Sequence, residues 1–139
     1  MAIFQGATNS FKKELLEKVH NLTSDSLYIA LYSSSASLGP NTTAYSATNE
    51  ITGTGYVAGG KLLTGAATAI SNNVAYVDFT DAAWTVSTLT ARGALIYNSS
   101  ASNKAIWVLN FGSDRTSTAS TFTVRFPSAD SDSAIIRIG

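Results

Sequence analysis

The feature that most limits the fold of this chain is a series of short apolar segments in which hydrophobic and polar residues alternate. Residues 27–32 (LYIALY) place Leu27, Ile29 and Leu31 on one side of the backbone. A period of two is typical of a β-strand with two different faces. Related segments follow at 56–63, 74–79, 89–97, 106–111, 122–126 and 135–138, separated by turn-forming residues at 71–73, 98–103, 112–114 and 127.

This pattern predicts a mainly β fold: a single antiparallel β-sandwich or barrel of about seven to eight strands. The length of 139 residues fits one domain, 1–139, with its own hydrophobic core. The residues expected to form that core are Leu27, Ile29, Leu31, Val77, Phe79, Leu95, Trp107, Leu109, Phe111, Phe122, Val124 and Phe126.

One segment near the N-terminus has helical periodicity instead. Phe11, Leu15 and Val19 are spaced by four residues, and charged residues occupy the opposite face, which predicts an amphipathic helix over 9–21. His20 is expected on the surface at the end of this helix, where a positive charge suits the helix dipole. The predicted organisation is an extended arm (1–8), the helix (9–21) and a β-sandwich (26–139) interrupted by an aperiodic loop (33–49).

Charge and residue usage exclude several classes of site. Nine Lys and Arg balance nine Asp and Glu, so the basic excess expected of a nucleic-acid-binding protein is absent. The sequence has no cysteine, which excludes disulfides, thiolate metal sites and cysteine nucleophiles. A single histidine cannot build a histidine metal site, and no Gly-x-Ser-x-Gly motif accompanies it. We therefore expect no catalytic residue, no metal and no cofactor.

Asp78, Asp81 and Arg92 are the charged residues that interrupt apolar segments. They have two interpretations: a catalytic carboxylate cluster with an arginine clamp, or a structural ion pair. An inward-facing arginine without a carboxylate partner costs several kcal/mol, which favours the structural ion pair.

Glycines at 53–60 (GTGYVAGG) suggest a phosphate-binding loop at first sight. The Lys-Ser/Thr ending of a P-loop is missing and no helix pattern follows, so we interpret these glycines as positions of positive φ or close backbone approach.

The first ten residues lack the basic and apolar stretches of a signal peptide, and no apolar run is long enough to span a membrane. We accordingly expect no membrane association.

Four segments carry a resemblance to a known family: 9–16 (NSFKKELL), 53–61 (GTGYVAGGK), 78–84 (DFTDAAW) and 90–98 (TARGALIYN). Together they make the chain similar to a family of small virion structural proteins of tailed bacteriophages. The resemblance implies a decoration or cement protein of the head, or a component near the tail. It carries no active-site motif. It implies localisation in the virion, after synthesis in the cytoplasm of the bacterial host.

The partners implied by this resemblance are the major capsid protein or other virion proteins, together with further copies of the chain as dimers or trimers. The arm 1–8 and the loop 33–49 are the segments expected to contact neighbours, and removal of the arm is expected to leave the isolated fold intact. The candidate contact residues are Ile3, Phe4, Leu38 and Tyr45.

Two other functions remain open from the sequence. A carbohydrate-binding module would need exposed aromatic rings on one surface, and the candidate rings are those of Tyr28, Tyr32, Tyr45, Tyr56 and Trp84. A hydrolase would need a cleft that brings Asp78 and Asp81 together.

Overall fold

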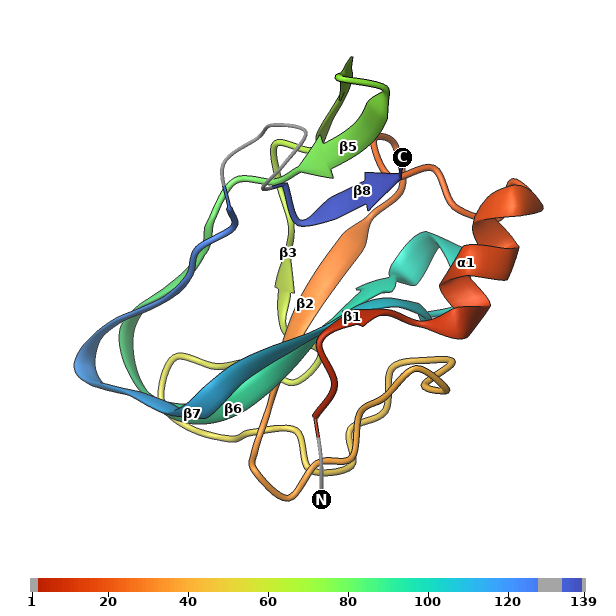
Figure 1. Cartoon of the computed structure of the whole chain (residues 1–139). Coiled ribbons are helices and arrows are strands. Elements are labelled where there is room, and N and C mark those ends of the chain that lie inside the picture. The colour runs from red at the N-terminus through yellow and green to blue at the C-terminus, as the bar shows by residue number, and fades with distance from the viewer. Residues whose placement is uncertain (1–2, 128–133, 139) are drawn as a thin grey trace.

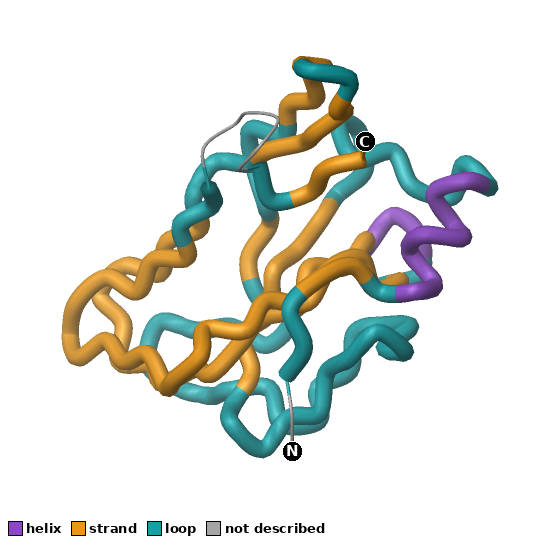
Figure 2. Tube along the Cα trace, viewed as in Figure 1, coloured by secondary structure: helices purple, strands orange, loops and turns teal. Residues whose placement is uncertain are grey.

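The computed structural model of the chain describes residues 3–127 and 134–138. It is built from two antiparallel sheets and one α-helix (Figures 1 and 2), so the predicted mainly β fold with an N-terminal helix is confirmed. The two sheets pack in a sandwich-like arrangement and do not close into a barrel within the described ranges. The elements are β1 (Gly6–Ala7), α1 (Asn9–Leu16), β2 (Leu27–Tyr32), β3 (Lys61–Leu62), β4 (Ala67–Ser71), β5 (Val74–Asp78), β6 (Ala82–Asn98), a 3-10 turn (Ser99–Ala101), β7 (Lys104–Val124) and β8 (Ile136–Ile138).

The larger sheet has the strand order β1-β7-β6-β2-β3, and the smaller sheet has the order β4-β5-β8. β6 and β7 are much longer than predicted, and they form a ribbon that curves around one side of the molecule (Figure 1). The predicted segment 106–111 and residues 122–124 of the predicted segment 122–126 belong to this single strand β7. The turn expected at 112–114 is wrong, because these residues form a bulge between Asn110 and Arg115 and the chain does not reverse there. Register shifts in the ribbon, one of them beside Val86 at φ 48°, bend the strands without ending them.

Helix α1 ends at Leu16, five residues before the predicted end. Lys18 takes a left-handed conformation (φ 62°) and donates its backbone N–H to the Leu15 carbonyl. The N–H of Val19 reaches back to the Glu14 carbonyl at 3.0 Å. These two bonds form a Schellman motif, which closes the helix with lysine at the position where glycine is most common.

The larger sheet is covered on both faces. One face packs against the smaller sheet and α1, and most of the predicted core lies in that layer. On the other face Ala30, Tyr32 and Leu95 pack under Leu38 and the loop 33–49. All predicted core residues are buried except Trp107, Phe111 and Phe126, which are partly buried against the same cluster.

None of the helices within the described part of the chain is long and apolar enough to cross a membrane.

Candidate functional site: an apolar groove beside the smaller sheet

The inner face of the smaller sheet is apolar, and only part of it is covered by the rest of the molecule. Register places Val77 opposite Ile136 and Ala75 opposite Ile138, with side chains directed to the same face. Val77 and Ile136 are buried in the core, at 2% and 3% exposure. Ile138 is 56% exposed because the sheet extends beyond the core beneath it. The outer end of the face is therefore left uncovered.

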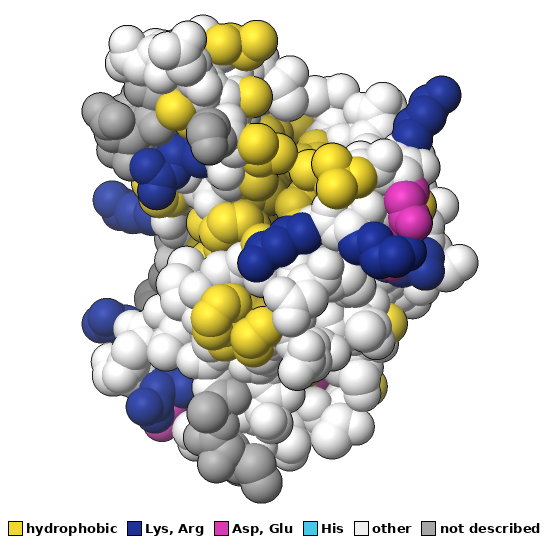
Figure 3. All heavy atoms as spheres, turned by 45° about the vertical axis from the view of Figure 1, so that its right-hand side comes forward, with side chains coloured by type: hydrophobic (Ala, Val, Ile, Leu, Met, Phe, Trp, Pro, Cys, Tyr) yellow, Lys and Arg dark blue, Asp and Glu magenta, His cyan; other side chains and the backbone are white. Residues whose placement is uncertain are grey.

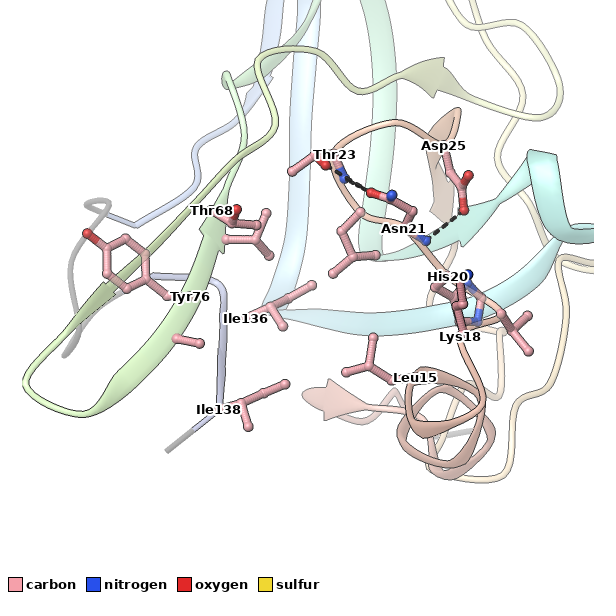
Figure 4. Close-up of a pocket in the computed structure, with 14 residues that line it drawn as sticks. Leu15, Lys18, His20, Asn21, Thr23, Asp25, Thr68, Tyr76, Ile136 and Ile138 are labelled. Atoms are coloured by element: carbon pink, nitrogen blue, oxygen red, sulfur yellow. Dashed lines mark hydrogen bonds between the residues drawn. The ribbon is translucent and has the colours of Figure 1, made fainter.

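Helix α1 and the segment after it form the opposite wall of a groove. Figure 4 shows Leu15 facing Ile136 and Ile138 across the gap, and Figure 3 shows hydrophobic side chains gathered in the hollow. The groove has a volume of about 480 Å³ and is open to solvent along its length. Its lining residues are Leu15, Lys18, Val19, His20, Asn21, Leu22, Thr23, Asp25, Thr68, Ala75, Tyr76, Val77, Ile136 and Ile138.

A buried polar network holds this helical wall in place. The side chain of His20 is fully buried, so the prediction of a surface histidine is wrong. Its Nε2 lies 3.0 Å from Oε1 of Glu14, and its Nδ1 lies 3.0 Å from Nδ2 of Asn98. Early termination of α1 folds the chain back and brings the ring beneath the helix, where it packs against Phe11.

The orientation of the Asn98 amide sets the donor and acceptor roles of the two His20 ring nitrogens. Its Nδ2 also donates to Asp25 Oδ2 at 2.7 Å, and its Oδ1 accepts from the backbone N–H of Ser100 at 2.9 Å. The amide orientation is thus set from both ends, so Nδ2 donates to His20 Nδ1, and His20 Nε2 donates to Glu14. Hydrogen bonds from the Asn21 backbone and then from Asn98 hold the pKa of Asp25 below its usual value.

A second polar cluster, centred on Glu50, holds the loops beside β2 together by hydrogen bonds. The carboxylate of Glu50 accepts hydrogen bonds from the hydroxyls of Tyr45 and Tyr56, both at 2.5 Å, and from the Gly59 N–H at 2.8 Å. Burial, with the negative charge of Glu50, raises the pKa of the Tyr97 hydroxyl to about 12. Burial and the hydrogen bonds to Glu50 also raise the pKa values of Tyr45 and Tyr56.

The predicted ion pair of Asp78 or Asp81 with Arg92 does not form. Arg92 lies on the ribbon, where its Nη1 is 3.7 Å from Oδ1 of Asp114, and both side chains are substantially exposed. Asp81 accepts the backbone N–H of Phe126 at 2.8 Å. Asp78 Oδ1 is buried without a hydrogen-bond partner among the described residues. The prediction failed because Arg92 points outward to solvent, where it needs no buried carboxylate.

The predicted contact residues lie mainly against their own chain. The Phe4 N–H donates to the Leu38 carbonyl at 2.8 Å, and Ile3 forms a bridge with Leu38, whose side chain is 8% exposed. Tyr45 stacks on Tyr97 with ring centroids 4.7 Å apart. Phe4 remains 38% exposed. The arm and the loop therefore cover the larger sheet, in addition to any role toward a partner.

The aromatic rings proposed for sugar stacking are not assembled on an open surface. Tyr32 and Trp84 are buried, at 1% and 4% exposure, and Tyr28 and Tyr56 are partly buried.

The glycine segment has the structural role predicted for it. A Cβ on Gly60 would lie 1.9 Å from the Ile29 carbonyl oxygen, at a φ of 86°.

The groove was not predicted from the sequence. Its walls come from α1, β5 and β8, which are far apart along the chain, and β4 was not recognised as a strand. The available signal was the alternation of 67–71 (ATAIS) before the turn Asn72-Asn73. No group of three or more metal-ligating side chains occurs within 3–127 and 134–138.

Comparison with known proteins adds no assignment: no family model matches the chain, and neither curated proteins nor solved structures give a match.

Proposed function

We propose that this protein is a structural subunit of a bacteriophage virion, a decoration or cement protein that binds the head shell without a catalytic step. The observation that carries the proposal is the uncovered apolar groove. Exposed and contiguous apolar surface marks sites where a protein contacts another protein. Ile138 lines the outer end of the groove at 56% exposure, and Ile70 on the same face of β4 extends the apolar surface beyond it at 80% exposure.

Two of the four segments that resemble virion proteins form structural parts of this fold. In 90–98 the side chain of Ala91 is fully buried, and a Cβ on Gly93 would lie 2.6 Å from the Leu109 carbonyl oxygen. Segment 9–16 coincides with α1. In these two segments the resemblance lies in residues that determine the fold, as expected for a family whose role is structural.

A carbohydrate-binding function has less support, because its stacking platform requires open rings. The hydrophobic side chains that remain most exposed along the groove are aliphatic, and aliphatic side chains favour a protein partner over a sugar.

The proposal is tested by adding purified protein to phage head shells that lack it and measuring co-sedimentation. We expect binding to saturate at a fixed number of copies per shell, set by the symmetry of the shell. Ile138→Asp should weaken binding at least tenfold without altering the circular dichroism spectrum, because Ile138 is half exposed.

Val57→Asp is the matched control, since Val57 is 75% exposed and outside the groove lining. Binding to tails and not to heads would move the assignment to the tail or collar. Absence of binding to any virion part, with the fold intact, would refute the proposal.

A further inference from the structure

The edges of the two sheets differ in how well they are protected against pairing with another strand. Edge strands in natural proteins are usually short, charged, bulged or interrupted by proline. β1 and β3 have two residues each, and β3 contains Lys61. β8 has three residues and contains Arg137. β4 has five residues (ATAIS) with no charge and no proline, and within the described chain it pairs only with β5.

The type of hairpin turn determines which residues of β4 direct their backbone N–H and C=O groups toward the free edge. Asn72 and Asn73 both have positive φ, 51° and 65°, as a two-residue type I′ turn requires. The residues that flank such a turn exchange hydrogen bonds with each other, and this pairing alternates along an antiparallel ladder. Thr68 and Ile70 are therefore the residues whose N–H and C=O groups point away from β5.

We propose that β4 pairs with β4 of a second copy of the chain, antiparallel about a twofold axis at Ala69. In this register Thr68 lies opposite Ile70 of the partner subunit, and both such pairs exchange N–H···O=C hydrogen bonds. Ala69 lies opposite Ala69 of the partner subunit, on the twofold axis. This register overlaps all of β4, from Ala67 to Ser71.

The pairing is complementary in its side chains as well as its backbone. Directly opposed residues share a face, so Ile70, 80% exposed in the single chain, packs beside Thr68 of the partner subunit. The two smaller sheets become one continuous sheet with both apolar grooves on the same side. The β4–β5 hairpin stands out from the body of the molecule, so a second copy can reach its edge (Figures 1 and 2).

The contact is small. Pairing of two five-residue strands buries far less than the ~1,200 Å² of a stable interface, so the dimer is weak in dilute solution. It gains strength where copies are held close together, because linked contacts act at a high effective concentration. This inference rests on the sheet edge alone and is independent of the proposed virion role.

Disulfide cross-linking tests the register, since the chain has no cysteine of its own. Equivalent residues at the axis form a non-hydrogen-bonded pair with Cα atoms about 4.5 Å apart, within the range of about 4.4–6.8 Å that a disulfide accepts. Ala69→Cys should therefore give a disulfide-linked dimer under mild oxidation. Ala67→Cys is the matched control, because it lies on the same face but about 14 Å from its equivalent.

We expect Ala69→Cys to cross-link at least tenfold faster than Ala67→Cys, and a mixture of Ala67→Cys with Ser71→Cys to form the mixed dimer. Adding Thr68→Pro to Ala69→Cys should reduce the rate to that of the control. Proline at position 68 removes the N–H that points toward the partner subunit. It leaves the hydrogen bonds between β4 and β5 in place, because that N–H does not point toward β5. Equal rates for Ala69→Cys and Ala67→Cys, with unchanged circular dichroism spectra, would overturn the proposal.

Discussion

Removal of the Glu50 carboxylate is the most informative test of how the loops are held. Three donors converge on it: the hydroxyls of Tyr45 and Tyr56 and the N–H of Gly59. A hydrogen bond to a charged group contributes about 1.5–3 kcal/mol. The three bonds share one acceptor, and freed donors near the surface regain bonds to water, so their contributions do not add. We expect Glu50→Ala to lower the free energy of unfolding by about 3 kcal/mol.

The measurement is urea denaturation followed by tryptophan fluorescence. The midpoint should fall while the slope m stays constant, because unfolding exposes the same surface. Glu17→Ala is the control: Glu17 pairs with Lys13 at 2.7 Å on the exposed face of α1, and such pairs contribute at most about 1 kcal/mol. A loss below about 1 kcal/mol for Glu50→Ala, or equal losses for both variants, would refute the reasoning.

Three further outcomes are expected. Gly60→Ala should destabilise the protein by more than about 2 kcal/mol in the same urea assay, because of the clash with the Ile29 carbonyl and the positive φ. Gly39→Ala, with open space around its Cβ, should be nearly neutral, and equal effects would contradict this reasoning. Stability should be full below about pH 10 and fall as the pH rises toward 12, because unfolded tyrosine ionises near pH 10 and the pKa of Tyr97 is raised to about 12. Urea midpoints at pH 9 and pH 11 measure this, and no difference between them would argue against it. Asn98→Ala should cost about 2 kcal/mol in thermal or urea melts, since it leaves the His20 network without its central donor; an unchanged midpoint would show that the network is not stabilising.

The sequence predicts those elements whose signals are local. Segment 27–32 becomes β2 with the expected residues Leu27, Ile29 and Leu31 in the core. The turn at 71–73 is the observed hairpin between β4 and β5. Period-two alternation and asparagine at positive φ need no information from distant residues, which explains these successes.

The failures have a common cause: the deciding contacts are distant in the sequence. Gly112 and Asp114 have the composition of a turn, yet β7 continues past them because β6 pairs with Asn110 before them and with Arg115 after them. His20 follows an apparently solvated helix face, but Asn98, 78 residues further along the chain, gives it a buried partner. The groove likewise exists only after Leu15 and Ile138 are brought together.

The N-terminal arm shows how the structure changes a prediction made from the sequence. Gly6 and Ala7 form β1 against β7, and the Thr8 hydroxyl accepts the N–H of Phe11 at the start of α1 at 3.2 Å. The Thr8 N–H donates to the Ile106 carbonyl at 3.0 Å. Deletion of residues 1–8 removes an edge strand and a helix cap, and a cap alone contributes about 1 kcal/mol.

We therefore expect this deletion to destabilise the isolated protein by several kcal/mol, and to lower its melting temperature, before any partner is involved. Thr8→Ala alone should cost about 1–2 kcal/mol, because the buried hydroxyl also lies near the Ala105 carbonyl. Thermal unfolding by circular dichroism measures both effects. A truncated protein that melts within about 2 °C of the full chain would show that the arm contributes nothing to the fold and is available for contacts with neighbouring subunits.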